Sequence, residues 1–344
     1  MKDSEPTNKL WLEKIAEATK LEWFGSRFLR QGIGPYIYVG IFLFITTFVI
    51  TPLISGPLHL IKDALGSFFS WTAAFFGIWA TKRMNDKFYD VVQKFDFSVG
   101  YLSFRLKYIL FFGGAIIIVG WILILNSIIP NPITGSYAQT IWRFIPLHIL
   151  LYAIWIFVYL MIVTEFLFHF VRIHYTPPKK VRKEEPELDY SDLERTGGMK
   201  RLGDVLLSST EYYFIGLTLF TFLPITYRSL VGPGSTILFA SGWIFGILMF
   251  FVPSFSVHSY IKEKKKDKMK DLRSRIEEAG YEPGGHLEVD PEDPEEREKY
   301  LFLYLEHEHL YDMNEYPFDR AILQELALAS GVPIVTESLI SLFF

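Results

Sequence analysis

The sequence contains no cysteine among its 344 residues. Disulfides, thiolate nucleophiles and Cys-ligated zinc are therefore excluded, and cysteine usage says nothing about a redox compartment. Charge is also scarce, because only 21% of the residues are Asp, Glu, Lys or Arg, and the formal net charge is −4. Such a chain offers no polycationic surface, so we expect no nucleic-acid partner.

Common enzyme motifs are missing as well. The chain has no phosphate-cradling glycine loop, no HExxH and no GxSxG. His307 and His309 alternate with Glu306 and Glu308, but residues two apart on a helix point to different faces, so we expect a solvated surface there. We therefore predict no enzyme, no metal and no cofactor. The first 35 residues also show no pattern of a removable signal peptide.

Apolar residues are abundant: hydrophobic types make up 50% of the chain and aromatic types 17%. Crossing a bilayer takes about 20 mostly apolar residues. Six segments meet or approach that length, at 36–55, 65–81, 108–129, 144–170, 212–227 and 235–252. All exceed strand length and none alternates with period two, so the predicted fold class is an all-α integral membrane protein with six transmembrane helices.

Lys and Arg in the connecting segments predict the orientation of these spans. Four basic connecting segments alternate with three nearly neutral ones, and the neutral ones contain only Lys62, no basic residue from 126 to 141, and Arg228. Basic loops stay on the cytoplasmic side. The sequence therefore predicts a multi-pass protein of the cell membrane, with the lipid bilayer as a partner and the N-terminus in the cytoplasm.

The same pattern predicts the organisation of the chain. We expect four parts: a cytoplasmic N-terminal segment with an amphipathic helix, 1–35; a six-helix transmembrane domain with cytoplasmic loops 82–107 and 172–208, 36–255; a cytoplasmic helical region, 256–330; and a short C-terminal membrane helix, 331–344. The N-terminal helix could lie at the inner membrane interface or pack on other cytoplasmic segments. Residues 176–206 contain three prolines and a glycine pair, which indicates a loop.

A helical hairpin is predicted after the sixth span. Residues 258–278 have no Pro or Gly and favour a helix, the turn 280–294 is rich in both, and a second helix is expected at 295–313. Such a hairpin reaches roughly 30 Å into the cytoplasm. It is too small for an enzyme domain, and its size suits an interaction or assembly module.

Two groups of polar residues within apolar segments are candidate sites. Glu337 and Ser338 share a helix face with Ser341, next to Thr336, and in an oligomer this face would form a ring of carboxylates and hydroxyls suited to cations. Alternatively the terminal segment only dips into the interface. Glu165 and His169 are four residues apart in the fourth span, so they could share a proton, ligate a cation, or form a structural polar pair.

The architecture resembles the seven-transmembrane ion-channel superfamily typified by insect odorant and gustatory receptors. The resemblance rests on six spans, enlarged cytoplasmic segments and a last helix that enters from inside. The superfamily's terminal motif begins with Thr-Tyr and closes with Gln-Phe; Thr336 and Phe344 match its ends, whereas Glu337 and Phe343 depart from it. The resemblance implies four subunits that assemble through cytoplasmic helices. The segment 315–319 also resembles uncharacterised prokaryotic multi-pass proteins.

Two functions follow as hypotheses. The first is an oligomeric, cation-permeable membrane channel that self-associates and lines its pore with the C-terminal helix. The second is a non-conducting membrane sensor or scaffold whose cytoplasmic hairpin binds a partner. A small ligand is left open by the sequence.

Overall fold

The structure, a computed structural model, is entirely helical in the residues that it describes. These residues are 10–20, 34–50, 64–97, 108–114, 145–190, 192, 195–221, 233–278, 294–317, 324, 326–328, 330 and 331. No β-strand occurs among them, which confirms the all-α class.

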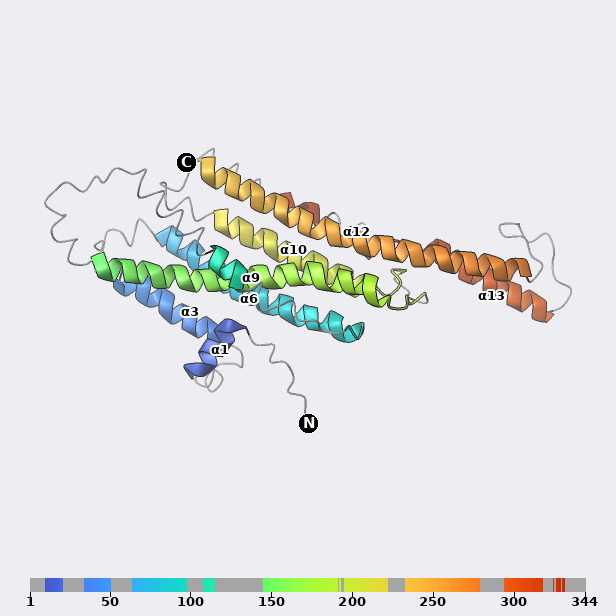
Figure 1. Ribbon diagram of the computed structural model, residues 1–344, viewed down its shortest axis with the longest axis horizontal. Coiled ribbons are helices and arrows are strands. Elements are labelled where there is room, and N and C mark those ends of the chain that lie inside the picture. Colours follow the sequence, from blue (N-terminus) through green and yellow to red (C-terminus); the bar gives the residue numbers. More distant parts are fainter. Residues whose placement is uncertain are drawn as a thin grey trace.

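Four long helices lie side by side and form the body of the molecule (Figure 1). They are α6 (Ala64–Lys94), α9 (Ile145–Glu184), α10 (Lys200–Thr221) and α12 (Pro233–Glu278). Helices α6 and α9 run in the same direction, because Gly77 lies against Ile162 and Phe88 lies against Arg172. Helix α10 runs opposite to α6, since Trp79 contacts Tyr212 while Lys87 reaches Ser208.

Shorter helices complete the structure. Helix α1 (Trp11–Ala18) and helix α3 (Gly34–Phe44), which continues as the π-helix η1 (Ile45–Ile50), lie along one edge of the body. Helix α13 (Pro294–Tyr311) returns antiparallel along the distal half of α12, and together they project beyond the other helices (Figure 1). The described bounds of α12 and α13 confirm the helices predicted at 258–278 and 295–313.

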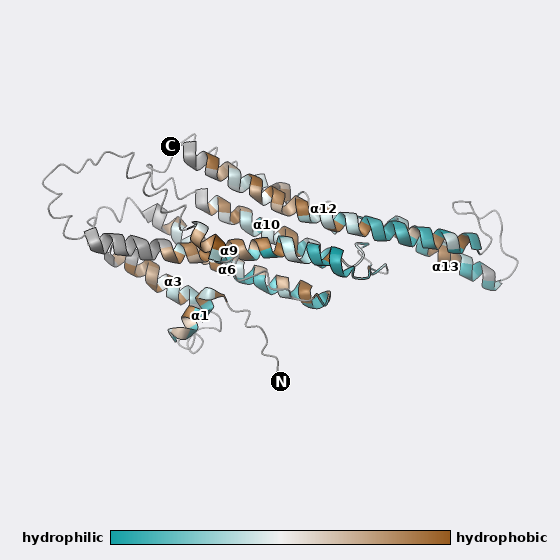
Figure 2. Cartoon of the chain, viewed as in Figure 1, coloured by the Kyte–Doolittle hydropathy of each residue, from teal (hydrophilic) through white to brown (hydrophobic). Residues whose placement is uncertain are grey.

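Two of the described helices contain segments long and apolar enough to cross a membrane, Phe157–Glu184 in α9 and Phe239–Glu278 in α12. At 1.5 Å per residue, full-length α9 and α12 are about 60 and 70 Å long, roughly twice the thickness of a hydrocarbon core. Figure 2 shows that the coloured part of each helix is brown and white near the middle and mostly teal toward its C-terminal end. An apolar half and a hydrophilic half are therefore built from the same continuous helices.

The hydrophilic half differs from the expected loops. Helix α6 continues to Lys94 and α9 continues through Pro177 and Pro178 to Glu184, where the sequence predicts the loops 82–107 and 172–208. The prolines cost helix hydrogen bonds. Ile173 and Val181, on either side of them, are fully buried in the same core, and this packing holds the helix together across the interruption.

The main core lies where these extensions pack together. It contains fully buried side chains from all four helices, namely Met84, Phe88, Phe170, Ile173, Leu202, Leu206, Phe250 and Ile261. A second core joins α1, α3, α6 and α9 around Leu12, Val39, Leu43, Ile78 and Ile162. A third, of only Leu272, Ile276 and Leu303, joins α12 to α13. The structure thus continues as a packed helical bundle well past the apolar segments.

Candidate functional site

The predicted polar pair of α9 is buried inside the bundle. Glu165 is 2% exposed and His169 is 4% exposed, and one carboxylate oxygen, Glu165 Oε2, lies 3.5 Å from His169 Nε2. The four-residue spacing places both on one helix face, as the sequence predicts. A carboxylate in such a place is costly unless it is paired and hydrogen-bonded.

Helix α1 supplies a hydrogen bond that this carboxylate needs. The backbone N–H of Trp11 donates to Glu165 Oε1 over 3.0 Å, although the two residues are 154 positions apart. The first turn of a helix has N–H groups without intrahelical acceptors and carries a partial positive charge, so a carboxylate is stabilised there. The geometry supports the structural interpretation of the pair, in which Glu165 accepts a hydrogen bond from the first turn of α1.

Side chains fix α1 in the same place. Leu12 and Ala16 are buried against the second core, and Lys82 of α6 forms a 3.0 Å ion pair with Glu13. Glu13 also accepts a hydrogen bond from the N–H of Leu10, which closes the first turn of the helix. Of the two placements that the sequence left open for this segment, the described part of α1 supports packing on other helices.

A buried histidine that the sequence analysis did not single out lies one turn further along α9. His174 is fully buried, its Nδ1 is 2.8 Å from the carbonyl oxygen of Phe170, and its Nε2 is 3.0 Å from Thr210 Oγ1 on α10. Burial lowers the pKa of His174 from 6.5 to about 4. It lies beyond Arg172, in the hydrophilic half of α9 and outside the span predicted at 144–170. The continued apolar spacing from Phe170 through Ile173 to Val181 is the signal that could have revealed a buried helix here.

The segment that follows α13 is held against the hydrophilic half of the bundle. The N–H of Asn314 donates to the carbonyl of Arg195 over 2.7 Å, and His258 Nδ1 is 3.0 Å from the carbonyl oxygen of Glu315. The His258 ring also stacks on Tyr316, with centroids 4.0 Å apart. Residues 312–317 therefore connect the end of α13 to α10, to α12 and to the turn at 195–199.

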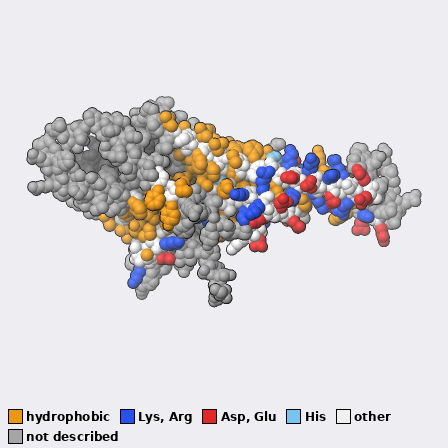
Figure 3. Space-filling view, in the orientation of Figure 1, with side chains coloured by type: hydrophobic (Ala, Val, Ile, Leu, Met, Phe, Trp, Pro, Cys, Tyr) orange, Lys and Arg blue, Asp and Glu red, His pale blue; other side chains and the backbone are white. Residues whose placement is uncertain are grey.

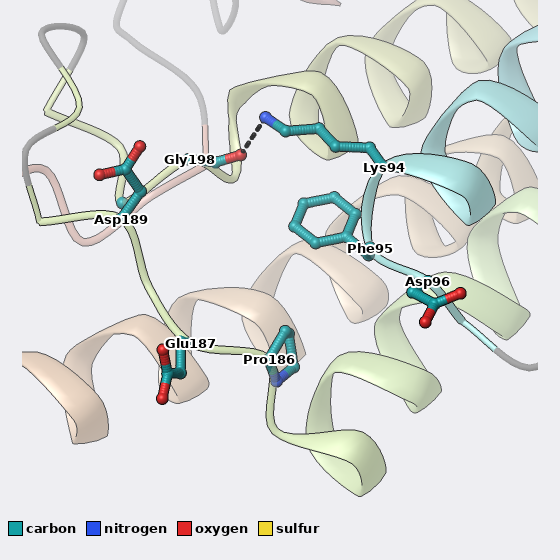
Figure 4. A pocket seen from close by; sticks show the side chains of 8 residues that line it. Lys94, Phe95, Asp96, Pro186, Glu187, Asp189 and Gly198 are labelled. Carbon is teal, nitrogen blue, oxygen red and sulfur yellow. Dashed lines mark hydrogen bonds between the residues drawn. The ribbon is translucent and has the colours of Figure 1, made fainter.

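A shallow cavity of about 290 Å³ lies where the end of α6 meets the segment between α9 and α10 (Figure 4). Lys94 crosses it and donates to the carbonyl of Gly198 over 3.0 Å. Figure 4 shows the carboxylates of Asp96, Glu187 and Asp189 pointing away from one another. Without converging polar groups, the cavity is a packing feature and not a binding site.

Helix α13 carries an exposed apolar patch formed by Leu301, Phe302 and Leu305. These side chains are 50%, 66% and 53% exposed. The opposite side of α13 packs on α12 through Leu303, and Lys268 of α12 pairs with Glu306 over 3.3 Å. Hence α13 is apolar on both faces at this level, but only one face is covered by described residues.

The remaining predicted site residues have no described geometry. Thr336, Glu337, Ser338 and Ser341 lie outside the described residues, so their role as pore-lining candidates stays a prediction. Within the described part of the chain, no three His, Asp or Glu side chains are grouped so as to hold a metal ion, His307 and His309 included. Comparisons with protein-family models, with curated proteins and with solved structures return no match.

Proposed function

We propose that this chain is a multi-pass membrane protein that self-associates through its cytoplasmic hairpin, α12 with α13. The observation that carries the proposal is the exposed patch of Leu301, Phe302 and Leu305. Apolar groups exposed together, rimmed by charge, mark an interaction surface.

The two halves of the surface differ in a way that supports a membrane location. On α12, apolar side chains are exposed from Ile237 to Phe255, and only 28% of the most apolar 18-residue stretch of this helix is buried. A core helix of a soluble protein would bury such a stretch, whereas we propose that lipid covers it here. Figure 3 shows hydrophobic side chains gathered in the middle of the molecule and interspersed Lys, Arg, Asp and Glu toward its right end.

The patch on α13 is too far from that zone for the same bilayer to cover it. Leu303 packs at the level of Leu272, and from Phe255 to Leu272 the helix rises about 25 Å. The patch must therefore be covered by protein if it is covered at all.

The charges around the patch are compatible with a second copy as the occupant. The hairpin exposes both signs: α13 exposes Lys299 and Glu308, and α12 exposes Lys266, Asp267, Lys270 and Asp271. Copies in one bilayer are related by rotation about its normal, so opposite charges on neighbouring hairpins can pair around the apolar contact, and the contact closes into a ring.

Assembly can be measured on the purified protein in nanodiscs. Phe302→Glu should shift the mass from oligomer to monomer, because it buries a charge in the contact. Tyr311→Glu is the matched control, since Tyr311 is 69% exposed on the same helix but outside the patch. Excision of residues 263–310 should also dissociate the oligomer. A monomeric wild type, or an oligomer that survives both changes, would contradict self-association through the patch. The patch would then bind a different protein, which favours the scaffold function.

Cation conduction is the function that we propose for the assembled protein. It is supported by the sequence of residues 332–344, where Glu337 stands with Thr336, Ser338 and Ser341 in an otherwise apolar segment. Copies arranged around one axis would bring these carboxylates together, and a cation would relieve their repulsion.

Reversal potentials under a salt gradient test this part separately. Glu337→Gln should reduce cation preference, while Asp90→Asn, which removes an exposed carboxylate from α6, should not. Equal selectivity for wild type and Glu337→Gln would remove Glu337 from the pore. An assembled wild type without conductance would leave self-association standing and favour the non-conducting scaffold.

A further inference from the structure

The contact between α1 and the body of the molecule has properties of a latch. Helix α1 has eight residues, Trp11–Ala18, and helices this short are not stable alone in water. Its helical state therefore depends on the contacts that it makes where it docks. Docking and helix formation are one event.

Those contacts are of two kinds, apolar and polar. On the apolar side, Leu10, Leu12 and Ala16 are buried, and the Trp11 ring contacts two aromatic rings of the helical segment 108–114. Leu10 and Leu12 leave only a gap of about 10 Å³ against the neighbouring helices. Because so short a helix depends on its docking contacts, the loss of one charged polar contact should weaken docking.

The polar contact at the start of α1 is the one with Glu165. It combines a charged acceptor, a 3.0 Å hydrogen bond from Trp11 N–H, and the positive end of the helix. His169 lies next to the same carboxylate. The ion pair between Glu13 and Lys82 connects the first turn of α1 to α6. Losing the charge on Glu165 would weaken docking, and undocking would leave that charge without the helix end that stabilises it.

We propose that α1 is a releasable latch that docks on α3 and on the middle of α6 and α9, and that Glu165 is the residue that holds it closed. Opening uncovers the apolar groove of Val39, Ile78 and Ile162 that Leu12 fills. The packing of three proposed spans is thereby linked to the state of the N-terminal segment. The inference does not depend on conduction or on assembly.

The absence of cysteine allows a direct test. Ala16 lies on the buried side of α1 and is 0% exposed. An Ala16→Cys thiol should therefore react with a maleimide only when α1 undocks. In the Glu165→Gln background, which keeps the side-chain size and removes the charge, we expect at least about tenfold faster labelling. Glu263→Gln removes an exposed carboxylate from α12 and should leave the rate unchanged.

A second reporter separates undocking from unfolding. Ser209→Cys, at a position 1% exposed in the main core, should stay protected in both backgrounds. Unchanged labelling of Ala16→Cys in Glu165→Gln would overturn the latch. Equal acceleration at Ser209→Cys would overturn it too, because Glu165 would then support the whole fold.

Discussion

At the residue scale, polar side chains connect helices that the sequence alone leaves unrelated. Glu165 meets the backbone of Trp11, His174 meets Thr210, and His258 meets the backbone and ring of the segment at 315–316. In each case a helix side chain makes a hydrogen bond to a different element. Buried polar groups therefore specify which helices pack, in addition to the apolar cores.

The buried His174 predicts a loss of stability in acid. Its pKa of about 4 lies below the ordinary value of 6.5, so the unfolded state binds more protons between these values. Stability from this group is therefore present above pH 6.5 and is lost progressively as the pH falls toward 4. Thermal unfolding of detergent-solubilised protein from pH 7.5 to 4.5 measures it. His174→Gln should show a flatter pH profile than wild type, and identical slopes would contradict the assignment.

At the element scale, tertiary packing decides where helices continue and how closely segments approach. Helix α9 passes two prolines because its flanking turns are buried, and α10 begins at Lys200 instead of near the predicted 212. The start of α10 lies against the segment after α13. A Cβ atom on Gly203 would be 2.0 Å from the carbonyl oxygen of Pro317, so only glycine fits.

Gly203→Ala should therefore destabilise the protein despite the better helix propensity of alanine. The backbone at Pro317 must move away, and overpacking of this kind costs about 1–3 kcal/mol. Gly113→Ala is the matched control, since a Cβ there meets nothing within 4 Å among the described residues. The midpoint of thermal unfolding should fall for the first variant and stay or rise for the second. Equal midpoints would mean that the segment at 312–317 is not held against α10.

At the scale of the whole molecule, the continuous helices join an apolar half to a hydrophilic half. The Lys and Arg residues of α6 begin at Lys82, and α9 and α12 change from apolar to charged in the same direction along the molecule. This common direction is consistent with the proposed orientation, in which α6, α9 and α12 all enter the cytoplasm with their C-terminal halves.

Cysteine labelling predicts and tests that orientation. In the cysteine-free chain, Lys183→Cys near the end of α9 should react with a membrane-impermeant maleimide only after the cells are opened. Ser136→Cys, in the neutral connection at 126–139, should react from outside. The reverse pattern would invert the topology, and labelling of both sites from outside would remove a span between them.

The sequence by itself determined the features that depend on composition or on local spacing. Long apolar runs without alternation required helices, the Pro- and Gly-rich stretch separated α12 from α13, and the four-residue spacing placed Glu165 and His169 on one face. Only the tertiary structure decided what these elements meet. The docking of Trp11 on Glu165, the pairing of His174 with Thr210 and the close approach at Gly203 join residues that are 154, 36 and 114 positions apart. No local pattern encodes such pairings, because they follow from how whole helices bury their apolar faces against one another.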